Sequence, residues 1–147
     1  MNGKTNNGTD ESRRIRILIA DDSAEFRHAL EIFLEQLTHL VEVVGAAEDG
    51  EHVLTLLPGT RPDLVLMDLQ MPRINGLQAT RKIRAEFPGV RVIMITLHDS
   101  GMWEAASAAA GADRFIAKHR LHQELPGALA QLFPRRGAKS TGTPHAA

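Results

Sequence analysis

The feature that most constrains the fold is an alternation of short apolar runs with longer segments of helical periodicity. Five runs rich in Val, Ile, Leu and Met recur along the chain, namely Ile15 to Ala20, Val41 to Ala46, Asp63 to Met67, Arg91 to Thr96 and Arg114 to Ala117. Several of them are almost continuously apolar, so we expect strands that are buried on both faces, as in a parallel sheet covered by helices.

The segments between the apolar runs carry helix signals. The first has an apolar stripe at helical spacing, made of Phe26, Leu30, Phe33 and Leu37. Asp22 or Ser23 is available as its N-cap. Four more helices are expected, at Glu51 to Leu57 (stopped by Pro58-Gly59), Leu77 to Phe87, Gly101 to Ala110 (with Gly111 as the C′ residue) and about His122 to Phe133 (stopped by Pro134).

Five strands that alternate with five helices predict right-handed crossovers and an α/β fold, with a five-stranded parallel sheet in a three-layer α/β/α sandwich. The length of 147 residues suits one domain. We place this domain at residues 14–133, between a disordered leader (1–13) and a disordered tail (134–147), because both flanks are polar and have little to bury.

Composition narrows the class of protein. There is no cysteine, which excludes disulfides and thiolate metal sites. The net charge of −1 provides no global basic surface for nucleic acid. The N-terminus has no apolar signal segment, and no apolar run approaches the roughly 20 residues that span a bilayer. We therefore expect a cytoplasmic protein that binds neither membrane nor nucleic acid directly.

Polar residues stand at the carboxyl ends of four predicted strands. Asp21 and Asp22 follow the first strand, Asp68 the third, Thr96 ends the fourth and Lys118 follows the fifth. Ligands of a doubly wound sheet bind outside this edge, so these side chains are expected to meet there. Each of them alone has an ordinary structural role, as a cap, a strand end or a solvated charge. Their convergence favours a functional site.

The chemistry of this set is that of phosphoryl transfer. Converging carboxylates repel one another, and a hard divalent cation such as Mg²⁺ removes that cost. An ammonium and a hydroxyl beside a metal form a clamp for a phosphoryl group. A carboxylate in such a clamp can act as the nucleophile and become an acyl phosphate.

The chain resembles the receiver domains of bacterial response regulators, the phosphoproteins of two-component signal transduction. The matching segments are ILIADDS at 17–23, LVLMDLQMPRINGLQ at 64–78, VIMITLHD at 92–99 and GADRFIAK at 111–118. The resemblance covers about residues 14–133 and implies a flavodoxin-like (βα)5 fold with strand order 2-1-3-4-5.

The resemblance also implies a role for each matching residue. Asp68 corresponds to the phosphoacceptor, and Asp21 and Asp22 to the acidic pair that holds Mg²⁺ together with Asp68. Gln70 lies at the position whose backbone carbonyl completes the metal shell. The remaining positions contact the phosphoryl group or respond to it, and they are Thr96 (the switch hydroxyl), Lys118 (the partner of a phosphoryl oxygen) and Phe115 (the aromatic residue that turns inward).

A signalling role follows from these assignments. A histidine kinase or a phosphotransfer protein would donate the phosphoryl group, which adds roughly −1.5 to −2 charge units. The fourth helix, fifth strand and fifth helix would then change and control a downstream protein partner or a phosphorylation-dependent homodimer. Phe115 is almost equally well explained as a core aromatic. Trp103 is interpreted as a packing or partner-contact residue.

Two positions depart from the pattern of many receivers. His119 follows Lys118 where proline is common, so we expect either a trans peptide with a different loop or a strained cis peptide. Leu97 replaces a small residue after Thr96 and is expected to narrow access to the phosphoryl group, slowing small-molecule donors or hydrolysis. Leu97-His98 resembles receivers whose output is a helix-turn-helix domain.

Alternatives stay open at this point. A Mg²⁺-dependent phosphohydrolase with an aspartyl-phosphate intermediate needs an acid two residues after its nucleophile, where this chain has Gln70. A degenerate receiver would bind partners without modification.

The chain is either a single-domain regulator or part of a longer one. The basic residues of the tail, Arg135, Arg136 and Lys139, are interpreted as a solvated end.

Overall fold

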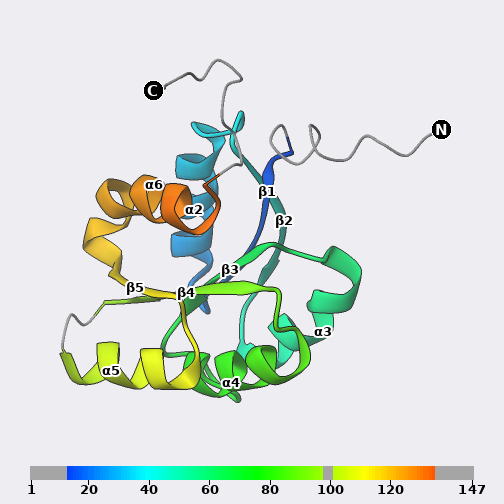
Figure 1. Ribbon diagram of the computed structural model, residues 1–147, viewed down its shortest axis with the longest axis vertical. Coiled ribbons are helices and arrows are strands. Elements are labelled where there is room, and N and C mark those ends of the chain that lie inside the picture. Colours follow the sequence, from blue (N-terminus) through cyan, green and yellow to red (C-terminus); the bar gives the residue numbers. More distant parts are fainter. Residues whose placement is uncertain (1–12, 98–100, 135–147) are drawn as a thin grey trace.

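The computed structural model describes residues 13–97 and 101–134. Most of the predicted leader and tail, with Arg135, Arg136 and Lys139, lies outside the described residues, as does His98. One sheet contains five parallel strands in the order β2-β1-β3-β4-β5 (Figure 1). The strands are β1 (Ile15–Ala20), β2 (Val41–Ala47), β3 (Leu64–Asp68), β4 (Arg91–Thr96) and β5 (Arg114–Ala117). The predicted parallel sheet and strand order are confirmed, with each strand end within one residue of its expected place.

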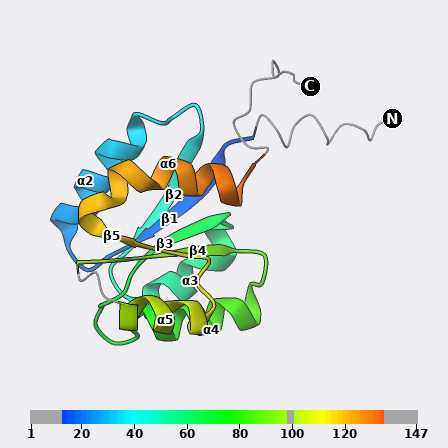
Figure 2. The same ribbon diagram turned by 60° about the vertical axis from the view of Figure 1, so that its left-hand side comes forward.

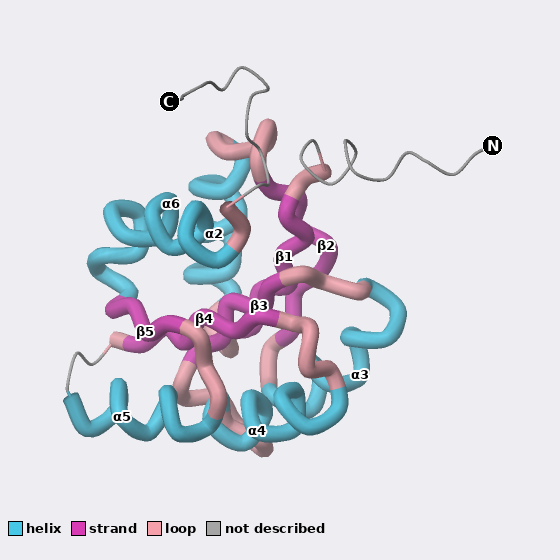
Figure 3. The backbone as a smooth tube through the Cα atoms, viewed as in Figure 1, coloured by secondary structure: helices cyan, strands magenta, loops and turns pink. Residues whose placement is uncertain are grey.

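Helices cover both faces of the sheet, so the predicted three layers are confirmed. On one face lie α2 (Ala24–Glu35) and α6 (Leu121–Leu132) (Figures 1 and 2). On the other face lie α3 (Gly50–Thr60), α4 (Gly76–Glu86) and α5 (Gly101–Ala110). Figure 3 shows the strands as a central layer between these two groups of helices.

The core consists of two apolar clusters, one on each face of the sheet. Ile17 and Ile19 of β1 belong to the cluster under α2 and α6, whereas Leu18 and Ala20 of the same strand belong to the cluster under α3 and α4. Alternate residues of a strand point to opposite faces, so both faces of β1 are apolar. Burial of each Leu or Ile side chain stabilises the folded state by about 1.5–3 kcal/mol. Because both faces of such a strand are buried, its sequence is a continuous apolar run.

Most predicted helix ends are confirmed to within one residue. Ser23 is the N-cap of α2, because its hydroxyl accepts a 3.1 Å hydrogen bond from the Phe26 N–H. A capping box of Asn75 and Gln78 begins α4. Gly111 follows α5 with a φ of 108°, the left-handed region in which a side chain is strained, so its predicted C′ role is confirmed.

The prediction that Pro58-Gly59 stops the second helix is wrong. The helix α3 continues to Thr60, and Arg61 is its C-cap. The Arg61 N–H donates to the carbonyl of Leu57 at 3.0 Å. Pro58 cannot donate to the preceding turn, but it faces solvent while Leu57 is buried in the core. Burial of the inner face therefore outweighs the single lost hydrogen bond.

The junction after β5 resolves the question raised by His119. No peptide bond is cis within residues 13–97 and 101–134, so the bond between Lys118 and His119 is trans. The chain instead turns through a short 3-10 helix, η1 (Lys118–Arg120), before α6. Of the two expected alternatives, the structure therefore has the trans peptide bond.

Among the residues that the structure describes, no helix combines the length and apolar character that a transmembrane span requires.

Candidate functional site

The predicted polar residues meet at the carboxyl edge of the sheet. Carboxylate oxygens of Asp21, Asp22 and Asp68 all lie within 4.8 Å of one another. The Lys118 Nζ atom is 2.6 Å from Asp21 Oδ2 and 3.6 Å from Asp68 Oδ1. Thr96 is buried at the end of β4, in register with the last residue of β5. The strands β1, β3, β4 and β5 thus bring together residues that are far apart in the sequence.

The acidic cluster is buried on one side and open on the other. Asp21 is 0% exposed and Asp68 is 5% exposed. Asp22, the next residue along the chain from Asp21, is exposed. A ligand from solvent would therefore reach the cluster past Asp22.

The surroundings of Asp68 shift the pKa of its carboxyl group. Burial, together with the negative charge of Asp21, raises the pKa of the Asp68 carboxyl from an ordinary 3.8 to about 7. The Lys118 ammonium and a hydrogen bond from the backbone of Gln70 lower this pKa, and Asp22 adds a smaller increase. The surroundings of Asp68 thus disfavour the charged form of its carboxyl group.

The lysine lies closer to Asp21 than to the predicted phosphoacceptor. Asp21 also accepts a 2.8 Å hydrogen bond from the Ser23 N–H, and its carbonyl accepts a 2.6 Å hydrogen bond from Arg27. The Phe26 ring centroid lies 4.2 Å from the Lys118 ammonium. Sequence reasoning missed Arg27 and assigned Phe26 only to the core stripe. Their places in the first turn of a helix that follows the acidic pair were the available signal.

The loop after Asp68 is shaped by close backbone contacts. Gly76 donates to the Leu69 carbonyl at 3.0 Å, and a Cβ atom at Gly76 would lie only 2.4 Å from the Asp68 carbonyl oxygen. Arg73 has a φ of 64° and pairs with Asp49 at 3.5 Å. The loop is therefore held close under the acidic cluster, and Gly76 admits no side chain.

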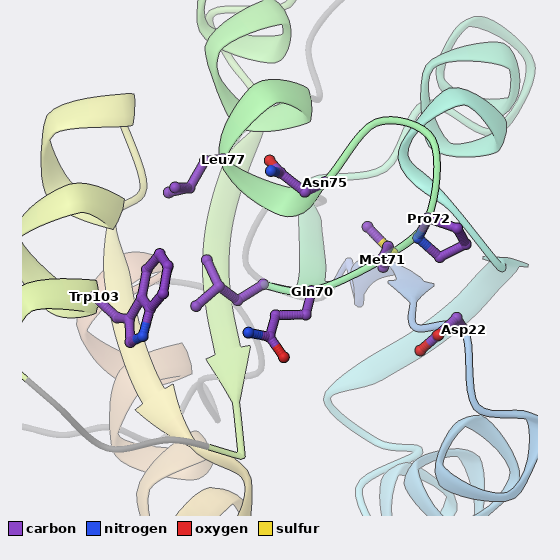
Figure 4. Close-up of a pocket in the computed structure, with 8 residues that line it drawn as sticks. Asp22, Gln70, Met71, Pro72, Asn75, Leu77 and Trp103 are labelled. Atoms are coloured by element: carbon purple, nitrogen blue, oxygen red, sulfur yellow. The ribbon is translucent and has the colours of Figure 1, made fainter.

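A cavity of about 480 Å³ opens beside the cluster (Figure 4). Polar and apolar side chains line it, namely Asp22, Leu69, Gln70, Met71, Pro72, Asn75, Leu77 and Trp103. In Figure 4 the side chain of Gln70 lies between Trp103 and Asp22. Trp103 is half-buried and packs against the core cluster under α3 and α4, in keeping with the packing role expected for it.

Two further predicted residues lie near the site. Phe115 is half-buried on β5 and packs against the same core cluster as Trp103. Leu97, directly after Thr96, is 73% exposed. The proposed narrowing of access by Leu97 stays a prediction, since most of this side chain faces solvent.

The donor set suits a hard divalent cation. Three carboxylates within 4.8 Å provide oxygen ligands only, which are the ligands that Mg²⁺ prefers. The raised pKa of Asp68 points the same way, because burial and, after it, the charge of Asp21 disfavour the carboxylate form, and a bound cation would offset both effects. The residues at this edge therefore fit a Mg²⁺ site.

A doubly wound parallel sheet with an acidic cluster and a lysine at its carboxyl edge defines the receiver class of signalling domain. The sequence matches the family model of the response regulator receiver domain over residues 17–130. The chain belongs to this family, the receiver domains of two-component response regulators. The resemblance carried by the four sequence segments is thereby confirmed.

Known relatives support the same assignment. The chain is 34% identical over 119 residues to the response regulator GacA of Pseudomonas aeruginosa, which covers 81% of this chain and 55% of that protein. It is 34% identical over 105 residues to the transcriptional regulatory protein DegU of Brevibacillus brevis, covering 71% and 44% respectively. The chain spans about half the length of these curated relatives.

Solved structures show the same fold. The signal receiver domain of NarL from Mycobacterium tuberculosis superposes with a TM-score of 0.75 at 30% identity, covering 82% of this chain and 97% of that one. A two-component response regulator of the LuxR family from Aurantimonas sp. gives a TM-score of 0.77 at 30% identity, covering 87% and 91%. The flavodoxin-like fold predicted from the sequence is thereby confirmed.

Proposed function

We propose that this receiver accepts a phosphoryl group on Asp68 from a histidine kinase or a phosphotransfer protein in the cytoplasm. The observation that carries the proposal is the cluster itself, in which three carboxylates lie within 4.8 Å of one another and Lys118 reaches two of them. An arrangement with excess negative charge around one ammonium is costly for the fold and useful for binding a metal and a phosphoryl group.

Asp68 is the best acceptor of the three carboxylates. Asp21 is fully buried and already engaged by Lys118 at 2.6 Å, whereas Asp22 is exposed and suited to contact a metal from the solvent side. Asp68 ends the central strand and lies 3.6 Å from Lys118, and it retains an exposure of 5% where Asp21 has none. It therefore combines access with a neighbouring positive charge.

The metal would be held by the three carboxylates and the backbone carbonyl of Gln70. A bound Mg²⁺ would neutralise charge on the carboxylates and on the transferring phosphoryl group. The protein's own part is to orient Asp68 and to hold it next to Lys118.

The transfer step balances as a substitution at phosphorus. One Asp68 carboxylate oxygen bonds to phosphorus while the P–N bond of the donor's phosphohistidine breaks, and the electron pair of that bond stays on the imidazole nitrogen. The product is an acyl phosphate on Asp68. Lys118 and the Thr96 hydroxyl then donate to phosphoryl oxygens, which favours one geometry of the loop after β4.

The output surface would be the face formed by α5, β5 and α6. Thr96 ends β4 just before α5, and Phe115 lies on β5, so both sit where the modified site could influence this face. We propose that this face binds a downstream protein or a second copy of the chain. We also propose residues 14–133 as the receiver domain.

A signalling role is favoured over enzymatic turnover. Gln70 stands where a phosphohydrolase of this chemistry needs an acid, and an amide does not transfer protons usefully. Hydrolysis of the acyl phosphate is then slow enough for the modified state to act as a signal. The alternative of a degenerate receiver requires Asp68 to stay unmodified, which the following experiment tests.

The test is titration with beryllofluoride and Mg²⁺, since beryllofluoride stands in for a phosphoryl group on a carboxylate. We expect a change in Trp103 fluorescence and in NMR shifts around Thr96 in the wild type, and no change in Asp68→Asn. Asp113→Asn, at the opposite edge of the sheet, is the matched control and should respond like the wild type. A wild type that does not respond, or an Asp68→Asn variant that does, would contradict the proposal.

A further inference from the structure

The ammonium of Lys118 has an aromatic neighbour besides its two carboxylates. Its Nζ atom lies 2.6 Å from Asp21, 3.6 Å from Asp68 and 4.2 Å from the centroid of the Phe26 ring. The lysine side chain is only 9% exposed. Cation–π attraction at such a shielded position is stronger than at the surface, because little water competes for the charge.

We propose that Phe26 is a positioning residue for Lys118, holding its ammonium beside Asp68 ready for the phosphoryl group. The inference rests on the proposed function and assigns Phe26 a part in it. Without the ring, the nearer carboxylate of Asp21 would dominate the placement of the ammonium. With it, the charge has a third attractive contact that is independent of either carboxylate.

The ring is fixed by the same short segment that carries the acidic pair. Ser23 caps α2 by accepting a hydrogen bond from the Phe26 N–H at 3.1 Å, and Arg27 donates to the Asp21 carbonyl at 2.6 Å. The first turn of α2 is thereby tied to the end of β1. Phe26 and Asp21 consequently reach Lys118 from one rigid unit.

An apolar groove makes such restraint necessary. The groove has a volume of about 200 Å³, lies between α2 and α6, and is lined by Phe26, Ala29, Leu30, Phe33, Lys118, Leu121 and His122. A lysine stem that borders apolar surface readily extends its ammonium toward water. The Phe26 ring opposes that escape, because its face attracts the ammonium at 4.2 Å.

The ring also has a chemical advantage over a polar neighbour. It attracts the positive charge through its quadrupole and has no oxygen to compete with the phosphoryl group for the N–H donors of the lysine. Lys118 can therefore keep this contact when it donates to a phosphoryl oxygen. A leucine at the same place would fill the space without attracting the charge.

The experiment measures beryllofluoride affinity in Mg²⁺ for the wild type, Phe26→Leu and Phe26→Tyr. Without the ring, the ammonium of the unligated protein occupies positions away from Asp68. Its return on binding costs up to about 1–2 kcal/mol, the strength of the lost contact, which corresponds to a roughly 5- to 30-fold weaker affinity in Phe26→Leu. Phe26→Tyr keeps an aromatic face and should stay within about twofold of the wild type. The affinity for Mg²⁺ alone should not change, because all three carboxylates are intact.

Two controls separate positioning from general packing. Phe33→Leu alters another aromatic residue of the same helix and the same groove, and it should leave beryllofluoride affinity unchanged. In a Lys118→Met background, Phe26→Leu should have no further effect. An equal loss in Phe33→Leu, an undiminished effect in Lys118→Met, or wild-type affinity in Phe26→Leu would each overturn the proposal.

A readout in the unmodified protein makes this inference independent of phosphorylation. The ring current of Phe26 should shift the Lys118 Hε resonances upfield, and Phe26→Leu should remove that shift. A wild type that ignores beryllofluoride yet shows the shift would overturn the proposed function but keep the contact. Unshifted Hε resonances would overturn the placement of the ammonium over the ring.

Discussion

The two edges of the sheet use the same kinds of charged residue in opposite ways. At the amino edge, Asp63 pairs with Arg13 at 3.1 Å and accepts the Arg16 N–H at 2.8 Å. Asp113 there pairs with Arg91 at 3.0 Å and accepts the Val92 N–H at 2.9 Å. At the carboxyl edge, three carboxylates cluster, and the ammonium of Lys118 lies beside two of them.

The comparison indicates that the carboxylates of the amino edge stabilise the fold, whereas those of the carboxyl edge are arranged to bind a ligand. Asp63 and Asp113 each have an arginine and a backbone N–H of a neighbouring strand, so the charge and a hydrogen-bond acceptor of each carboxylate are satisfied. At the carboxyl edge the pKa of Asp68 is raised to about 7 by burial and by Asp21, a sign of negative charge that the protein does not balance. Stability is given up there for binding.

The largest expected effect is on the pH dependence of stability, measured without divalent cations. The pKa of Asp68 rises from 3.8 in the unfolded chain to about 7 in the folded one, so the folded state holds this proton more tightly. Stability from this group is greatest below pH 4, declines as the pH rises to about 7 and then levels off. The full decline is at most on the order of 4 kcal/mol.

Asp68→Asn should remove this decline. At pH 8 in EDTA we expect the variant to be about 1–3 kcal/mol more stable than the wild type, with a smaller gain at pH 5. Urea denaturation at both pH values measures the difference. If the stability difference between the wild type and Asp68→Asn is the same at both pH values, folding does not raise the pKa of Asp68.

A smaller effect is expected where the backbone approaches the phosphoacceptor. A Cβ atom at Gly76 would lie 2.4 Å from the Asp68 carbonyl oxygen, so Gly76→Ala should destabilise the protein by about 1–3 kcal/mol. Gly127 in α6 has nothing within 4 Å of such a Cβ, and Gly127→Ala should stabilise by up to about 1 kcal/mol. Thermal unfolding of the two variants distinguishes them, and equal changes would refute the close approach.

The smallest effect is expected at the amino edge. Asp113→Ala leaves the buried Val92 N–H without its 2.9 Å acceptor and should cost about 1–2 kcal/mol. Arg91→Ala removes only the partly exposed ion pair and should cost less than about 1 kcal/mol. Neither variant should alter beryllofluoride affinity. A loss of affinity in either one would mean that the two edges are coupled.

Local rules predicted the fold well where a signal and its consequence are close in sequence. The caps at Ser23 and Gly111 depend on neighbouring backbone groups, so residue type and position sufficed. The same kind of rule failed at Pro58, because the helix continues to bury Leu57 against a sheet that is distant in sequence. A local rule contains no term for that burial.

For the site, the sequence by itself determined which residues gather. Parallel strands end at one edge, so Asp21, Asp68 and Lys118 had to meet there once five alternating strands were recognised. Only the tertiary structure decided their geometry. That Lys118 lies nearer to Asp21 than to Asp68, and that the Phe26 ring meets its ammonium, depends on how β1, β3, β5 and α2 pack. Electrostatic energies change steeply over a few ångströms, and such distances between elements are set by packing and leave no trace in a local pattern.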